Sequence, residues 1–218
     1  MSIKLKGTTA GSAVILAAPA DTSPTGTEKT FTLPTADGTS GQVLQTNGSG
    51  ALSFGNKTTN TQITRGTAVN LTGSSVEFTG IASDVRRITL VFLNISIDST
   101  DDWEVIIGDS GGAETSGYVS WNKRFGGSSF STGGSASQSG FLCGSNCNGA
   151  SSYFGEVIIY NPKNNDWVCT SQITDENDNF RWQTGKKSLS DTLTQVKISP
   201  SGTASFDGGY VQIFTETA

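Results

Sequence analysis

The chain has 218 residues, a net charge of −5, 27 glycines, three cysteines and no histidine. A polypeptide of this length holds one sizeable domain and an extension. The lack of histidine removes the commonest general base and metal ligand, which argues against an enzyme. The negative charge argues against nucleic-acid binding, because that binding depends on Lys and Arg that neutralise phosphates. Low charge, many turn residues and scattered Val, Ile, Phe and Trp together indicate an all-β protein.

The beginning of the chain holds a short apolar run, Ala13–Ala20. This run is much shorter than the roughly 20 residues that a membrane-spanning helix needs. It follows two lysines, as a signal peptide would, but Gly11, Ser12 and Pro19 interrupt it. We therefore expect a short strand here rather than a signal peptide or a membrane segment.

Residues 31–54 predict three short strands joined by two turns. The strands centre on Phe31–Leu33, Val43 and Leu52–Phe54, and the turns fall at Asp37-Gly38 and Asn47-Gly48. Asp-Gly and Asn-Gly favour tight turns because both residues tolerate a positive φ. So few large apolar residues do not form a core within one chain. We expect identical neighbouring chains to cover them; the candidate interface residues are Phe31, Leu33, Val43, Leu44, Leu52 and Phe54.

The same residues read F-T-L-P-T-A-D-G-T-S-G-Q-V-L-Q-T-N-G-S-G-A-L-S-F. This run resembles the β-structured module of bacteriophage tail fibres and related virion adhesins. Residues 1–21 resemble the start of tail-fibre-type proteins of marine phages that infect cyanobacteria, and segments 87–92, 107–112 and 206–210 resemble a terminal domain of that group. The resemblance implies a virion structural protein, assembled in the host cytoplasm and exposed on the particle. It also implies a homotrimer that contacts other virion proteins through its N-terminal part.

Composition divides the chain into an extended arm at 1–57, a polar linker at 58–64 and a C-terminal domain at 65–218. In that domain the strongest strand candidate is 87–97, whose β-branched and aromatic residues predict a central strand. Turn residues separate further strand candidates, and no segment shows helical periodicity. The pattern predicts a β-sandwich of the jelly-roll type. The further strands are expected at 103–107, 115–121, 141–143, 153–160, 167–173, 179–183, 193–198 and 210–214.

Period two within these strands predicts which side chains form the core. The expected core residues are Trp103, Val105, Ile107, Val157, Ile159, Trp167, Cys169, Val196 and Ile198. Residues 125–152 are different, since they consist mostly of Gly, Ser and Thr. Two interpretations remain open for them. They form either a long functional or mobile loop, or in part an edge strand that packs against a neighbouring subunit.

No cofactor, metal or catalytic site is expected. Cys143 and Cys147 leave three alternatives, which are a local disulfide, half of a metal site and two free thiols; structural zinc would need four Cys or His ligands. The run Asp175–Asn179 begins like a calcium loop, but Phe180 occupies the sixth position and Lys186 the twelfth, so a polar hairpin is expected. Ser110 lies in a Gly-Asp-Ser-Gly-Gly run, yet it lacks a histidine base.

One segment suits recognition of a host surface polysaccharide. An exposed aromatic ring packs on the apolar face of a sugar, while polar groups bind its hydroxyls. The alternative is that Tyr118 and Trp121 are core or interface residues. The candidate receptor contacts are Tyr118, Trp121, Lys123, Arg124, Phe125 and Phe130. The sequence therefore predicts a tail fibre or appendage subunit, and the second possibility is a capsid-decorating or tail-cementing protein without a receptor.

Overall fold

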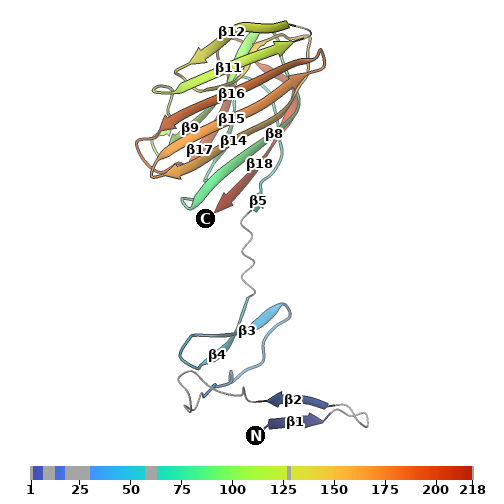
Figure 1. Ribbon diagram of the computed structural model, residues 1–218, viewed down its shortest axis with the longest axis vertical. Helices are drawn as coiled ribbons and strands as arrows, with labels where there is room; N and C mark the ends of the chain where they lie inside the picture. The colour runs from blue at the N-terminus through green and yellow to red at the C-terminus, as the bar shows by residue number, and fades with distance from the viewer. Residues whose placement is uncertain (1, 7–12, 18–29, 57–62, 127–128, 218) are drawn as a thin grey trace. The chain divides into compact units, whose positions relative to one another are not determined.

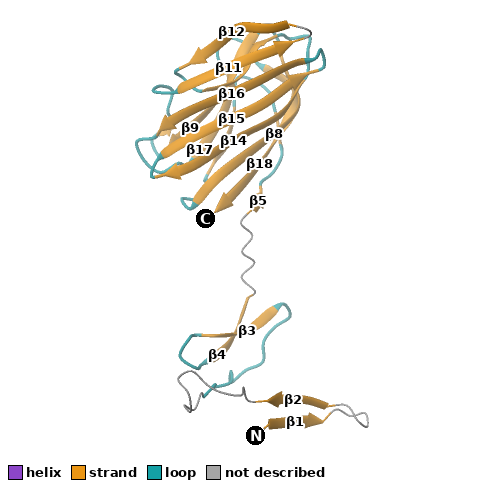
Figure 2. Cartoon of the chain, viewed as in Figure 1, coloured by secondary structure: helices purple, strands orange, loops and turns teal. Residues whose placement is uncertain are grey.

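A computed structural model describes residues 2–6, 13–17, 30–56, 63–126 and 129–217. Every regular element in these ranges is a strand, and the strands pair into several antiparallel sheets (Figure 2). The chain divides into two compact units, Met1–Asn60 and Thr61–Ala218, so the division falls inside the segment 58–64. The described residues include no helix long and apolar enough to cross a membrane.

The first unit contains two small hairpins. Strand β1 (Ser2–Lys6) pairs with β2 (Ala13–Ala17), which confirms a strand within the apolar run, and β3 (Gln42–Thr46) pairs with β4 (Leu52–Asn56). The Asn47-Gly48 turn forms as predicted. Gly48 has a φ of 83°, and the Asn47 Oδ1 accepts hydrogen bonds from the backbone N–H groups of Ser49 and Ala51.

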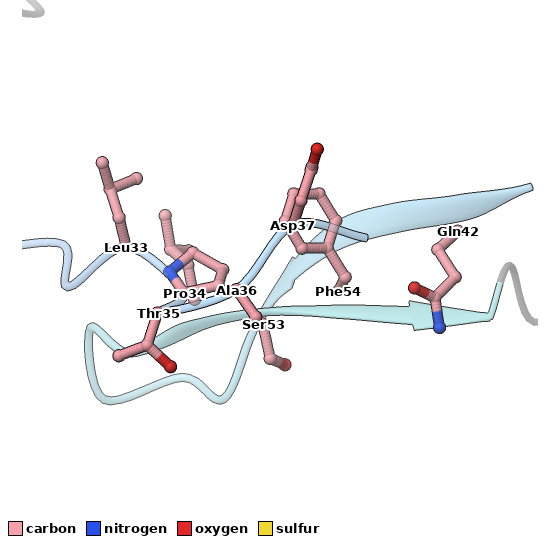
Figure 3. A pocket seen from close by; sticks show the side chains of 9 residues that line it. Leu33, Pro34, Thr35, Ala36, Asp37, Gln42, Ser53 and Phe54 are labelled. Carbon is pink, nitrogen blue, oxygen red and sulfur yellow. The ribbon is translucent and has the colours of Figure 1, made fainter. Parts of the chain in front are cut away.

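The third strand expected in this unit is reduced to a single bridge between Thr32 and Ala51. Leu33 and Phe54 line a pocket of about 460 Å³ together with residues of the 34–37 segment (Figure 3). Phe31 is 61% exposed and Leu33 is 69% exposed. The unit therefore leaves its largest apolar side chains in solvent, because too few partners surround them within one chain.

The second unit is built from two antiparallel sheets. The five-stranded sheet runs β10-β9-β17-β7, with β13 also paired to β9, and the nine-stranded sheet runs β12-β11-β16-β15-β14-β8-β18-β5, with β6 also paired to β18. Figure 1 shows the long strands of the larger sheet side by side. The strand bounds are β5 Ile63–Arg65, β6 Val69–Asn70, β7 Val76–Thr79, β8 Val85–Ile97, β9 Asp101–Asp109, β10 Gly112–Ala113, β11 Val119–Gly126, β12 Ser129–Ser137, β13 Phe141–Cys147, β14 Tyr153–Lys163, β15 Asp166–Asp175, β16 Asn179–Ser188, β17 Gln195–Pro200 and β18 Phe206–Thr217.

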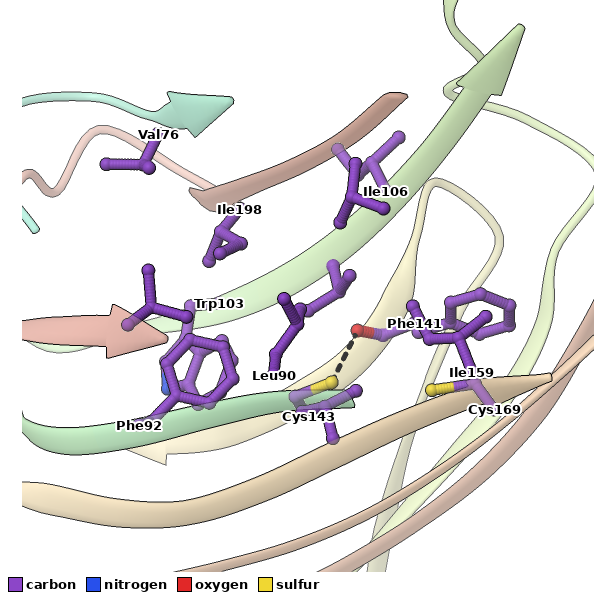
Figure 4. Packing of buried hydrophobic residues seen from close by; sticks show 14 of the residues in the cluster. Val76, Leu90, Phe92, Trp103, Ile106, Phe141, Cys143, Ile159, Cys169 and Ile198 are labelled. Atoms are coloured by element: carbon purple, nitrogen blue, oxygen red, sulfur yellow. Dashed lines mark hydrogen bonds between the residues drawn. The ribbon is translucent and has the colours of Figure 1, made fainter. Parts of the chain in front are cut away.

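The core lies between these two sheets. Ile88, Leu90 and Phe92 alternate along β8 toward the smaller sheet, and the ring of Phe92 lies 5.2 Å from that of Trp103 on β9 (Figure 4). All nine residues predicted for the core are buried. The expectation that 87–97 is a central strand is also confirmed, since β8 lies between β14 and β18.

Residues 125–152 do not form one long loop. They contain β12 and β13, so the loop interpretation is wrong; β12 is an edge strand, which ends the larger sheet beside β11, while its packing against a neighbouring subunit stays a prediction. Glycine and serine are accommodated here because the backbone groups of β11 and β12 pair in an antiparallel hairpin. The strand expected at 115–121 instead begins at Val119.

The three cysteines are free and buried in the core. Cys143 and Cys147 form no disulfide, so the free-thiol alternative is confirmed. The Cys143 thiol donates a hydrogen bond to the Phe141 carbonyl, and that of Cys169 donates to the Gln183 side-chain oxygen. Cys169 is buried as a small apolar residue, as its place in β15 predicted.

Candidate functional site

Strands β11 and β16 reverse the usual distribution of polar and apolar side chains in a sandwich. They pair antiparallel, with Trp121 opposite Thr184 and Lys123 opposite Trp182. In each strand, one alternate set of side chains is polar and turned toward the core, where Ser120, Asn122, Arg181 and Gln183 are buried. The other alternate set carries the aromatic rings and faces solvent. Period-two folding alone would place the apolar set in the core. The reversal therefore requires hydrogen-bond partners in the core for the buried polar side chains. On the other side, it leaves the aromatic rings available for a ligand.

The outer side of this pair carries a cluster that we call the aromatic patch, made of Trp121, Phe125, Phe180 and Trp182. Trp121 is 57% exposed and Trp182 is 52% exposed. Phe125 lies opposite Phe180, with ring centroids 6.3 Å apart and the ring planes tilted by 31°. Trp121 and Trp182 are diagonal neighbours across the two strands, within reach of one another for side chains of this size. Large exposed rings grouped in this way indicate a binding surface.

Apolar side chains continue from the aromatic patch across the larger sheet. Phe180 lies opposite Thr174 on β15, which lies opposite Phe154 on β14. On the next two strands Leu93 lies opposite Tyr210. Phe154, Leu93 and Tyr210 are each about two-fifths exposed. The outer face thus presents a line of apolar groups that runs across the strands.

The inner side of β11 and β16 is held by a buried hydrogen-bond network. The Asn122 side-chain N–H donates to the carbonyls of Leu142 and Cys143 on β13, and its Oδ1 accepts a 2.6 Å bond from the Ser145 hydroxyl. The Ser120 hydroxyl accepts from the Leu142 N–H. Buried polar groups cost stability only when they lack partners. These bonds therefore let polar residues face the core and leave the aromatic residues outside.

An ion pair closes one end of this network. The Arg181 guanidinium, which is 1% exposed, lies 3.2 Å from the Asp175 carboxylate and 4.8 Å from the centre of the Tyr153 ring. Burial alone would raise the pKa of Asp175. Hydrogen bonds from Asn179, Asn177 and Arg181 outweigh burial and lower the pKa below its ordinary value. The run 175–179 is therefore the polar hairpin between β15 and β16, with Asp175 anchored inside.

The structure separates the six predicted receptor contacts. Trp121, Lys123 and Phe125 share the outer face. Tyr118 is 2% exposed, and its hydroxyl bonds both the N–H and the carbonyl of Ile107, so its assignment as a receptor contact is wrong and the core alternative is confirmed. Burial also raises the pKa of Tyr118.

Arg124 does not share the outer face either. It lies opposite the buried Arg181 in the β11–β16 register, and its guanidinium donates 2.8 and 3.2 Å hydrogen bonds to the Asn179 Oδ1. Its grouping with Trp121 and Lys123 is therefore wrong, because consecutive strand residues point to opposite sides. Phe130 lies opposite Phe125 in the β11–β12 register.

A pocket of about 350 Å³ adjoins the same face at the other end of β11 and β16. Val119, Val168 and Lys186 line it from the outer face, and Asp166 and Ser188 line it from the β15–β16 pair. The Ser188 hydroxyl donates a 2.5 Å hydrogen bond to the Asp166 carboxylate. Lys187, on the opposite side of the strand, forms an ion pair with Glu114.

The aromatic patch and its neighbours offer stacking faces, hydroxyls, an amide and ammonium groups, which are the kinds of group that suit ligand binding. Within the described ranges, no group of three or more His, Cys, Asp or Glu side chains is placed to hold a metal ion. Comparisons with protein-family models, with curated proteins and with solved structures found no match to this chain.

The β16 half of the patch, Phe180 and Trp182, was not predicted from the sequence. The signal was present, because Phe180-Arg181-Trp182-Gln183 alternates aromatic and polar residues at period two. That pattern alone does not reveal which set is buried. The decision depends on β13, whose backbone supplies partners for Asn122 and Arg181.

Proposed function

We propose that this protein is a phage virion structural protein, a tail fibre or appendage subunit whose C-terminal unit recognises a host surface polymer. The observation that carries the proposal is the reversed polarity of β11 and β16, which exposes Trp121 and Trp182. Exposed indoles weaken solubility and contribute little to folding, so their grouping is best explained by a ligand. A sugar ring fits such a surface, because its C–H face packs on aromatic rings while its hydroxyls bind polar neighbours.

Recognition of this kind needs no catalytic group, and in this proposal the protein is not an enzyme. The sequence contains no histidine. The buried acid nearest the patch, Asp175, is engaged by Arg181 and by backbone N–H groups. The function is therefore adhesion, in which many copies on one particle strengthen a weak contact by about 10²–10⁴.

The first unit has the role of assembly in this proposal. Phe31, Leu33, Val43 and Leu44 are exposed, and Phe54 is more than one-third exposed, so a partner surface would bury substantial apolar area. We assign that surface to two further copies in a homotrimer and to neighbouring virion proteins. Residues 1–57 as a docking arm, and the jelly-roll type for the sandwich, belong to the same proposal.

A second candidate is a capsid-decorating or tail-cementing protein without a receptor. It is favoured by the apolar line that continues from the aromatic patch to Leu93 and Tyr210, since a wide apolar face also suits protein packing. Antibody labelling of intact particles separates the two candidates. Label at fibre tips supports the adhesin, and label in a regular head or tail lattice supports decoration.

Adsorption tests the patch itself. Phage that carry Trp121→Ala together with Lys123→Gln should adsorb to host cells more slowly, because both side chains lie on the outer face. Tyr160→Ala is the matched control, since Tyr160 is also partly exposed on the outer side of the sheet but lies on β14. Wild-type adsorption by a folded, incorporated double variant would refute recognition through this patch.

A further inference from the structure

We infer that the ligand of the aromatic patch is a neutral polysaccharide that lies along β11 and β16, parallel to the strands, with one sugar unit seated in the pocket of about 350 Å³. This inference rests on the proposed function and specifies the class of its ligand. Three features of the outer face support it, which are the succession of rings along two strands, the polar side chains of β15 and the groups that line the pocket.

The exposed rings follow one another along β11 and β16. Phe125 and Phe180 are opposed at one level of the pair, and the next two levels carry Trp182 and then Trp121. The level after these carries Lys186, which lines the pocket. A strand rises about 3.3 Å per residue, so this track from Phe180 to Lys186 is about 20 Å long. Such a length suits several linked sugar units rather than one.

Strand β15 supplies hydrogen-bonding side chains beside this track (Figure 1). Its outward residues Thr170, Gln172 and Thr174 follow one another at period two. Gln172 lies opposite Trp182, and Thr174 lies opposite Phe180. Neighbouring strands are about 4.8 Å apart, so these hydroxyls and the amide lie within reach of a ligand on the rings. A polysaccharide along β16 would place its C–H faces on the rings and its hydroxyls toward β15.

The outer face carries both signs of charge, which favours a neutral polymer. Lys186 and Asp166 line the same pocket from β16 and β15. Lys123 and Glu156 lie at one level of the sheet, on β11 and β14. A polymer with charges of one sign would meet like charges as well as opposite ones on this face, so charge gives it no advantage.

The pocket suits one hydroxyl-bearing ring. One carboxylate oxygen of Asp166 accepts a 2.5 Å hydrogen bond from the Ser188 hydroxyl, and the other has no hydrogen bond to a described residue. Lys186 forms no ion pair within the described part of the chain. A hydroxyl both donates and accepts, so a sugar hydroxyl can accept from this ammonium group and donate to the carboxylate. Val119 and Val168 supply apolar walls for the C–H groups of the ring.

Affinity electrophoresis of the full-length protein tests the class of the ligand. Each gel contains one polymer, which is a neutral one (dextran, hydroxyethylcellulose or galactomannan) or an anionic one (dextran sulfate or carboxymethylcellulose). We expect at least one neutral polymer to retard the protein, and no anionic polymer to bind more tightly. Trp182→Ala should weaken this binding, because it removes a ring from the middle of the track.

Two substitutions test the direction of the ligand. Asp166→Ala, at the pocket end of the track, should weaken binding about tenfold. Phe154→Ala should leave binding unchanged, since only a chain that crossed the strands at the level of Phe180 would contact this ring on β14. Glu77→Ala is the matched control for the loss of an acid, because Glu77 lies on β7 of the smaller sheet.

The outcomes separate this inference from the proposed function. Tighter binding to an anionic polymer overturns the neutral class, and glycan recognition stands if Trp182→Ala abolishes that binding. An effect of Asp166→Ala no larger than that of Phe154→Ala or Glu77→Ala overturns the direction along β16. Absence of retardation in every gel overturns the inference, and the adsorption assay then decides the proposed function independently. Circular dichroism of each variant verifies that it folds.

Discussion

Phe125 and Phe180 face each other across β11 and β16 on the side of the sheet that points away from the core. On the inner side of the same two strands, the opposed pair Asn122 and Gln183 is fully buried. The two pairs lie on the same strands, yet the polar one is inside and the aromatic one outside. This reversal is the feature from which the proposed ligand-binding role follows.

Asp175→Asn should destabilise the protein by about 3–5 kcal/mol, because it leaves the Arg181 guanidinium buried without a counter-ion. Urea unfolding at pH 7 measures the change in free energy. Glu176→Gln is the matched control, since Glu176 is an exposed acid in the same hairpin and should change stability by less than about 0.5 kcal/mol. Equal effects of the two substitutions would contradict the role of the ion pair.

The same carboxylate predicts a pH dependence. The pKa of Asp175 is lower in the folded protein than its ordinary value of 3.8, so the folded state binds its proton less readily than the unfolded state. Its contribution to stability is therefore complete above about pH 4–5 and is lost as the pH falls through 3.8 toward the folded pKa. Unfolding measured at pH 7, 5 and 3 should show a smaller difference between wild type and Asp175→Asn at pH 3. A difference that grows toward acid pH would refute this assignment.

Trp167→Ala should cost about 3–5 kcal/mol, because the side chain is 3% exposed and its removal leaves a cavity between the sheets. Trp167→Phe should cost less, since the phenyl ring keeps most of the packing and the buried indole N–H has no hydrogen-bond partner among the described residues. Urea unfolding compares the two variants with wild type. A loss below 1 kcal/mol in Trp167→Ala would show that this indole is not a core residue.

The three thiols should resist modification in the folded protein. Burial raises the pKa of Cys147 to about 12, and burial also raises the pKa of Cys169, so neither forms much thiolate near neutral pH. A thiol reagent at pH 8 should react with no cysteine in the native protein and with three after unfolding. Ser110→Cys adds an exposed thiol as a positive control. Rapid native reaction of a wild-type thiol would contradict this burial.

Deletion of residues 1–57 should leave a folded second unit that associates more weakly than the full chain. The reason is that the exposed apolar side chains Phe31 and Leu33 belong to the first unit, whereas the second unit has its own core. Analytical ultracentrifugation at micromolar concentration compares the two proteins. A full-length protein that sediments as a monomer of 22.7 kDa would refute the homotrimer.

The sequence allowed prediction of those parts of the fold in which apolar residues dominate. Strand β8 and the core residues on β9, β14, β15 and β17 follow from β-branched and aromatic residues at period two. The short strands β6 and β10 could not be predicted, because two residues carry no periodicity and their pairing depends on β18 and β9. For β12 the glycine-rich sequence concealed a strand that backbone pairing forms.

The candidate site was predictable only in part. Trp121, Lys123 and Phe125 were found because aromatic and basic residues adjoin in sequence. Tyr118 was misassigned because it precedes β11, and its hydroxyl bonds the backbone of Ile107 in the core. Trp182 was missed because it joins Trp121 through strand pairing across more than 60 positions of sequence. Pairing over that distance is set by the whole sheet and not by local residues.

Tryptophan indole resonances test the central claim most directly. The chain contains four tryptophans, of which Trp103 and Trp167 are buried and Trp121 and Trp182 are exposed in the aromatic patch. Titration of the ¹⁵N-labelled full-length protein with a polymer that it binds should shift the Nε1–H resonances of Trp121 and Trp182 and leave those of Trp103 and Trp167 in place. Binding that leaves both patch resonances unchanged would contradict recognition through this face.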